Sequence, residues 1–185
     1  MKWMIIAVAV LVAVVVAVAA IGAILPRDHI ASRTATIAAP PDSVWAALTH
    51  PEAYPAWRKD VDRVVLAPLN PAAPGTIAWR EYSKSGSDES LGYVIEHAEA
   101  PHHLVTRITD ANLPYSGAWT IAIEPAGAGS RVTITERGLV SNPIFRFVSR
   151  YVIGLSSSLD AYLHALGKKA GADVVPTDAA PLAIR

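Results

Sequence analysis

The chain has 185 residues, and its 16 lysines and arginines balance 16 aspartates and glutamates, so the formal net charge is zero. This length suits one domain, and neutrality argues against a nucleic-acid partner, because phosphate binding needs a basic surface. The absence of cysteine excludes disulfides, thiolate metal sites and a cysteine nucleophile. Hydrophobic residues make up 52% of the chain and charged residues 17%, which is apolar for a soluble domain.

The apolar excess is concentrated at the N-terminus. The segment from Trp3 to Leu25 has no charged side chain. At about 1.5 Å per residue, a helix of this length reaches roughly 34 Å, enough to cross a hydrocarbon core of about 30 Å. We therefore expect residues 1–26 to form a single transmembrane anchor that contacts the lipid bilayer through residues 3–25.

Two alternatives to an anchor stay open. Lys2 followed by an apolar run and by Ala17-Val18-Ala19 is typical of a cleaved signal peptide, although the run exceeds the usual h-region of about 7–15 residues. A buried core helix is the other alternative. Positive charges lie on both sides of the segment, with Lys2 before it and Arg27 and Arg33 after it, so the positive-inside rule does not assign the side of the membrane.

After the anchor, seven segments combine β-branched residues, alternation and flanking turn residues. The expected strands are residues 29–38, 61–66, 76–82, 89–98, 103–109, 117–124 and 130–140. Behind the first strand, Asp42 or Ser43 is a candidate N-cap of a short helix, and Pro51 can begin a second short helix toward Trp57. Short strands at this spacing predict an antiparallel meander.

The last element has the clearest helical periodicity. Pro143 suits the first helical position, and the apolar residues after it share one helical face. They are Ile144, Phe147, Val148, Tyr151, Val152, Leu155, Leu159, Tyr162, Leu163 and Leu166. Gly154 interrupts this pattern and predicts a bend. We expect the helix to cross the concave face of a curved sheet and to leave a cavity there, whereas residues 172–185 lack periodicity and are expected to be a disordered tail.

This order, β-α-α-β-β-β-β-β-β-α, resembles the helix-grip fold of the START-like or SRPBCC superfamily. The local sequence is similar to the polyketide cyclase/dehydrase and lipid transport branch. The supporting segments are Ala31–Ala38 with Pro41–Trp45, Tyr54–Val61, Ala118–Ile121 and Val132–Glu136. The resemblance implies an α+β domain over residues 27–171 that binds a hydrophobic ligand between a curved antiparallel sheet and a long C-terminal helix. The superfamily shares no catalytic signature, so the resemblance implies no catalytic residue and no cofactor.

Strand alternation sorts inward from outward side chains. The candidate ligand-binding residues are Trp57, Trp79, Glu81, Tyr93, Trp119, Glu136, Phe147 and Tyr151. A buried carboxylate needs a partner, because burying it alone is costly, and Arg80 or Arg107 could pair with Glu81 or Glu136 if a bulge shifted the register. The alternative is that both carboxylates are solvated at the rim and that the aromatic residues are ordinary core.

Other polar residues show no chemical motif. The six histidines, at positions 29, 50, 97, 102, 103 and 164, match no HxH or HExxH spacing, so no metal site is expected. His102 and His103 follow a proline and are expected in an exposed loop. Arg146 and Arg150 are expected on a solvated helix face, with lipid headgroup contact as the alternative.

These observations favour membrane-tethered binding of a small hydrophobic ligand, such as a lipid, a quinone or a polyketide-like compound. One alternative is a cyclase or dehydratase that uses Glu81 or Glu136 as general base. The other is a non-catalytic scaffold or regulatory module. The sequence leaves the identity of the ligand and the oligomeric state open.

Overall fold

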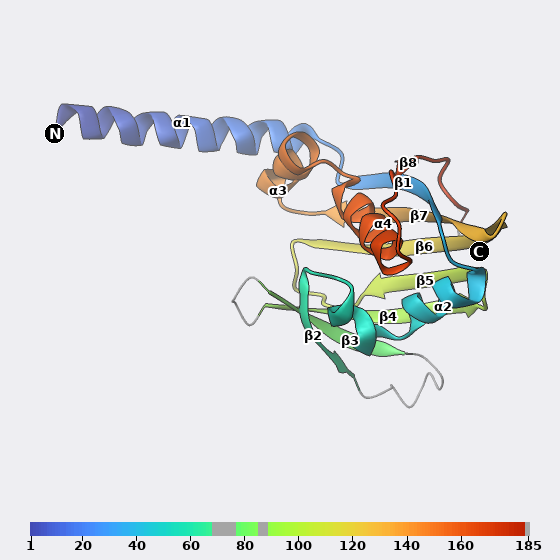
Figure 1. The fold of residues 1–185 in the computed structure, drawn as a ribbon. Coiled ribbons are helices and arrows are strands. Elements are labelled where there is room, and N and C mark those ends of the chain that lie inside the picture. Colours follow the sequence, from blue (N-terminus) through green and yellow to red (C-terminus); the bar gives the residue numbers. More distant parts are fainter. Residues whose placement is uncertain (68–76, 85–88, 184–185) are drawn as a thin grey trace.

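The computed structural model describes residues 1–67, 77–84 and 89–183. The helices are α1 (Lys2–Ile24), α2 (Pro41–Thr49), the 3-10 helix η1 (Pro51–Ala56), α3 (Pro143–Val148), the π-helix η2 (Ser149–Ile153) and α4 (Ser157–Lys169). The strands are β1 (Asp28–Ile37), β2 (Val61–Leu66), β3 (Ala78–Ser83), β4 (Ser90–Glu99), β5 (His103–Ile108), β6 (Tyr115–Ala126), β7 (Gly129–Val140) and β8 (Thr177–Asp178). Figure 1 shows a curved sheet with α2, η1 and α4 beside it and with α1 projecting away.

The strands form one antiparallel sheet in the order β2-β3-β4-β5-β6-β7-β1-β8. The consecutive order from β2 to β7 confirms the predicted meander and the α+β class. The first strand joins the far side of this meander, where it pairs with β7 from Asp28 opposite Leu139 to Ile37 opposite Ser130. Of the expected strand at residues 76–82, position 76 lies outside the described residues.

The core lies between the concave face of the sheet, α2 and α4. Val132 and Ile134 on β7 are fully buried, as strand alternation predicts, and Leu159 and Leu163 on α4 are fully buried with them. Burying such a side chain contributes about 1.5–3 kcal/mol to folding. This packing holds α4 against β1 and β7 and sets one wall of the interior.

The predicted C-terminal helix is divided into two parts that pack on different partners. After α3 and the single π-turn of η2, Gly154 adopts φ +91° and ψ 136°, a backbone conformation that side chains rarely allow. The bend predicted at Gly154 is therefore a complete break. Of the two parts, α4 packs against β1 and β7, whereas α3 packs mainly against α1 and touches the sheet at β7.

The tail after Gly171, expected to be disordered, is ordered through residue 183. Val174 is buried, and Thr177–Asp178 pair with β1 at the sheet edge. The Leu182 amide donates a hydrogen bond to Thr135 Oγ1 (2.9 Å), so the tail covers the outer face of β7 and buries that threonine. A short edge strand and isolated contacts leave no periodicity in the sequence, and the expectation of a disordered tail was based on that lack of periodicity.

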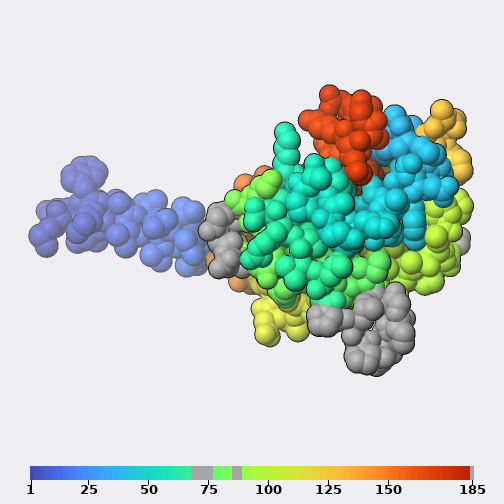
Figure 2. All heavy atoms as spheres, turned by 60° about the horizontal axis from the view of Figure 1, so that its bottom comes forward, coloured from blue at the N-terminus to red at the C-terminus, as the bar shows by residue number. Residues whose placement is uncertain are grey.

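The helix α1 is long and apolar enough to cross a membrane: it has 23 residues, and the mean hydropathy of its most apolar stretch is 3.3. None of that stretch is buried in the protein, and Figure 2 shows most of the helix standing clear of the domain. Its C-terminal part packs on α3, where Gly22 is buried and Val18 and Ala19 are half-buried. Arg146 was expected on a solvated face, but it is buried and donates to the Leu25 carbonyl oxygen (2.7 Å).

Candidate functional site

A cavity of about 420 Å³ lies between the concave face of the sheet, α4 and the segment from α3 to Leu155. Its walls are mostly apolar. The aliphatic lining residues include Leu48, Leu104, Ile108, Ile121, Leu139 and Leu155, and the aromatic ones include Tyr54, Trp79, Tyr93, Trp119 and Tyr162. The interior is thus not completely filled by side chains, and its size falls within the range of pockets that take small organic molecules.

The strands bring most of the predicted site residues to this cavity. Trp79, Glu81, Tyr93, Trp119 and Glu136 all line it. Trp79 on β3 and Tyr93 on β4 are register partners, and their rings stack with centroids 5.5 Å apart. The two-residue period of a strand is sufficient to predict these inward positions.

The structure does not place the other three predicted residues in the cavity wall. Trp57 packs edge-on against Tyr54 and Tyr162, with ring centroids 5.5 Å apart in both pairs. Phe147 and Tyr151 precede the break at Gly154, and their ring centroids lie 5.1 Å apart. Phe147 and Tyr151 were predicted on the apolar face of a single helix bent at Gly154, but both precede the complete break at that glycine and do not line the cavity.

Glu81 is held at one end of the cavity by two donors. Arg58 Nη1 donates to Oε2 (2.8 Å), and the indole Nε1 of Trp79 donates to Oε1 (2.9 Å). The side chains of Glu81 and Arg58 are 9% and 13% exposed, so this is a largely buried ion pair. The partner is neither Arg80, which pairs with Asp110, nor Arg107, which pairs with Glu96.

Arg58 connects Glu81 to a cage of aromatic rings. Its guanidinium carbon lies 5.3 Å from the ring centroid of Tyr54 and 5.2 Å from that of Tyr162. Burial is the largest single influence and would lower the pKa of Arg58, but Glu81, Tyr162 and Asp60 together outweigh it and raise the pKa, so Arg58 stays charged. Burial raises the pKa of Tyr162 to about 12, and this phenol therefore stays neutral at physiological pH.

Glu136 forms a second polar site in the cavity wall, where β1, β6, β7 and α4 meet. Its Oε1 lies 3.0 Å from His29 Nε2, and its Oε2 accepts from Trp119 Nε1 (2.9 Å) and Ser158 Oγ (3.2 Å). Trp119 and Glu136 are register partners on β6 and β7. Both cavity carboxylates are thus bound by an indole N–H and by a basic side chain.

Sequence reasoning missed Arg58 and His29, both of which line the cavity. A usable signal for Arg58 is its position directly before Lys59-Asp60 and beside Trp57, in a segment already quoted for the family resemblance. His29 carries no such signal. It reaches Glu136 only because β1 pairs with β7, where Ala31 is the register partner of Glu136.

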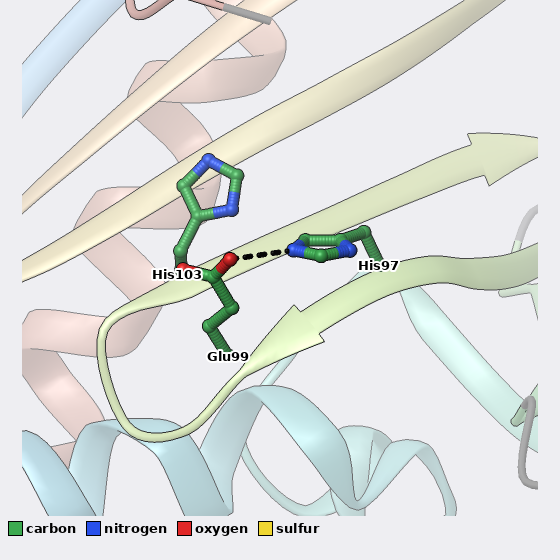
Figure 3. Close-up of side chains that lie close together, drawn as sticks. All are labelled: His97, Glu99 and His103. Carbon is green, nitrogen blue, oxygen red and sulfur yellow. Dashed lines mark hydrogen bonds and ion pairs between the residues drawn. The ribbon is translucent and has the colours of Figure 1, made fainter. Parts of the chain in front are cut away.

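The structure also corrects the expectation for one histidine pair. His102 is exposed as expected, but His103 begins β5 and is only 9% exposed. Figure 3 shows the His103 ring beside His97 and Glu99. These three side chains do not belong to the cavity wall, and sequence spacing alone did not group them.

The fold and the cavity define a START-like, hydrophobic-ligand-binding type of α+β protein. The chain belongs to the polyketide cyclase / dehydrase and lipid transport family, whose model matches residues 28–171. No curated protein matches the chain.

Solved structures share the fold at low sequence identity. A START superfamily protein from Mycobacterium smegmatis is 14% identical with a TM-score of 0.59, over 77% of this chain and 97% of that one. The Zhui aromatase/cyclase from Streptomyces sp. R1128 is 16% identical with a TM-score of 0.61, over 78% and 94%. A norcoclaurine synthase point mutant from Thalictrum is 13% identical with a TM-score of 0.58, over 77% and 94%.

Proposed function

We propose that this protein is a membrane-tethered binder of a small hydrophobic molecule, which it holds in the cavity between the sheet and α4. The observation that carries the proposal is the cavity of about 420 Å³, which has apolar walls and two polar sites. Transfer of an apolar ligand surface into such a cavity is favoured by roughly 25 cal/mol per Å². The name of the family to which the chain belongs includes lipid transport, and this also supports a hydrophobic ligand.

The two carboxylates narrow the kind of ligand. An ionised carboxylate has about four acceptor positions, and Glu81 uses two of them for Arg58 and Trp79. A donor group of the ligand can occupy a remaining position. We therefore favour a mostly apolar ligand that carries a hydroxyl or similar donor over a pure hydrocarbon.

The contacts of α1 support a retained anchor. An added Cβ at Gly22 would lie 1.9 Å from the Pro143 carbonyl oxygen, so the backbones of α1 and α3 are in close contact. Arg146 satisfies the Leu25 carbonyl at the end of the helix. Cleavage of a signal peptide after Ala19 would remove most of α1 and leave only its last residues in contact with α3.

The position of the cavity relative to α1 supports the same proposal. Phe145, Ile153 and Leu155 line the cavity and lie on or directly after α3 and η2, and α3 packs against the end of α1. The neighbouring Tyr151 and Val152 are exposed to 59% and 70%. With α1 in a bilayer, this apolar segment lies near the lipid surface, which gives a hydrophobic ligand a short path into the cavity.

Native mass spectrometry of the full chain, purified in mild detergent, tests ligand binding. We expect a co-purified small molecule to remain bound after the micelle is removed. Thr106 lines the cavity, so Thr106→Trp should fill it and remove the adduct, while Thr36→Trp on the exposed outer side of β1 should retain it. If the two variants and the natural chain behave alike, the cavity is not the binding site.

The intact mass of the membrane-extracted protein tests the anchor separately. We expect residues 1–26 to be retained and the protein to resist alkaline extraction of the membrane. A mature chain that begins near Ala19 or Ala20 would refute the tether, and the proposal for ligand binding would still stand or fall on the adduct.

A catalytic role is the second candidate, and one observation favours it. The close contact between His29 and Glu136 puts an imidazole and a carboxylate in the cavity wall, an arrangement suited to proton transfer. Glu81 suits this role less because its charge is committed to Arg58. If the co-purified molecule is turned over, Glu136→Gln should abolish turnover while binding persists.

A further inference from the structure

The β4–β5 hairpin brings three side chains that can bind a metal ion together on the outer side of the sheet. The ligand atoms of His97, Glu99 and His103 all lie within 4.8 Å of one another. His97 Nε2 is 3.0 Å from Glu99 Oε1, and the two imidazole centroids are 5.7 Å apart. Figure 3 shows the carboxylate of Glu99 between the two rings.

The backbone determines this arrangement. Glu99 and His103 are direct register partners, and the turn between them is closed by the His102 amide donating to the Glu99 carbonyl (2.8 Å). The register shifts between Ile95, which is buried in the core, and His97. A bulge of this kind re-aims the side chains that follow it, and here it places His97 and Glu99 on the face opposite to Ile95.

We propose that His97, Glu99 and His103 form a binding site for one zinc-class divalent cation. Two imidazoles with one carboxylate are a known three-residue ligand set for zinc, with water in the remaining position. Zinc bonds of about 2.0–2.2 Å bring donor atoms to roughly 3.3 Å from one another. The present spread of up to 4.8 Å therefore closes by small rotations of the exposed His97 and Glu99 side chains.

This site is separate from the hydrophobic cavity, since none of its three residues lines the cavity. It departs from the sequence-based expectation of no metal site. The cation would then bind on the outer face of β4 and β5, and the hydrophobic ligand would bind on their inner face. The cation would cross-link the two strands at their hairpin end.

Calorimetric titration of zinc into the full chain in detergent micelles, with any polyhistidine tag removed, tests the proposal. We expect one zinc per chain and a rise in the melting temperature with zinc. His97→Ala and Glu99→Gln should each weaken binding at least about tenfold, because even the loss of a supporting residue costs 10–100-fold in metal affinity. Both side chains are exposed, so the variants should fold as the natural chain does.

His164→Ala is the matched control, because it removes an exposed histidine of α4 that is not in the cluster. It should bind zinc as tightly as the natural chain. The proposal is overturned if zinc does not bind, or if it binds equally well to His97→Ala and Glu99→Gln. Retention of the hydrophobic adduct by His97→Ala would show that the two sites are independent.

Discussion

At the scale of single residues, the main feature of the interior is that its two carboxylates, Glu81 and Glu136, are each bound by several hydrogen-bond donors. Both lie in an apolar cavity, where an unpaired charge would be costly. Glu81 has a guanidinium and an indole as donors, and Glu136 has an imidazole, an indole and a hydroxyl. The tryptophans therefore pack as apolar residues while their N–H groups stabilise a charge.

This pairing predicts a large stability effect at Glu81. Glu81→Gln should lower the free energy of unfolding by about 3 kcal/mol, because it leaves the Arg58 cation in a largely buried place, and the ion-pair partner that remains among the described residues is the exposed Asp60. Urea denaturation followed by tryptophan fluorescence measures the change.

The exposed pair between Arg107 and Glu96 supplies the matched control. The two side chains are 52% and 45% exposed, so Glu96→Gln should change the free energy of unfolding by less than about 1 kcal/mol. Equal effects at positions 81 and 96 would contradict the importance given to the buried ion pair.

At the scale of elements, short irregular positions decide which surfaces meet. Gly154 ends η2 and separates α3 from α4, so one apolar pattern supplies two interfaces. The bulge in β4 has a similar effect on His97. Gly22 lets α1 approach α3 at backbone distance, because even a methyl group there would overlap the Pro143 carbonyl.

Gly22→Ala should therefore loosen the junction between α1 and the domain. In a free helix this change is stabilising by roughly 0.5–1 kcal/mol, so a loosening would come from the lost contact with Pro143. Trypsin should cleave faster after Arg27, the exposed residue between α1 and β1, and mass spectrometry of the fragments follows the rate. Ala17→Leu, on an exposed part of α1, should leave the rate unchanged, and an equal rate in both variants would argue against a fixed junction.

At the scale of the whole molecule, the C-terminal tail links α4 to the outer face of the sheet. Arg33 on β1 binds Asp160 of α4 through Nε (2.6 Å) and Asp178 of the tail through Nη1 (2.6 Å). Arg137 donates to the Leu182 carbonyl oxygen (2.5 Å). These contacts hold the tail against β1 and β7, beyond residue 171 where the family model ends.

Two adjacent valines test this role of the tail. Val174 is 8% exposed and Val175 is 83% exposed. Val174→Ala should lower the free energy of unfolding by about 2 kcal/mol, whereas Val175→Ala should change it by less than about 0.5 kcal/mol. Chemical denaturation of the full chain measures both, and similar values would mean that the tail adds little to stability.

The sequence by itself determined the local features of this protein. Composition was sufficient for the apolar helix α1, and the two-residue period was sufficient for the meander and for Trp79, Glu81, Tyr93, Trp119 and Glu136 in the cavity wall. These features depend on whether each side chain faces water or an apolar environment. In a regular helix or strand, that environment alternates with a fixed period, and the pattern of apolar residues in the sequence repeats with it.

The tertiary structure alone decided which distant groups meet. Arg58 beside Glu81, His29 beside Glu136 and Val174 in the core depend on strand register and on the closure of the sheet by β1. The complete break at Gly154 is also a result of tertiary packing, because α3 packs against α1 while α4 packs against the sheet. Contacts between residues far apart in the chain are selected by the packing of the complete fold, and no local period records them.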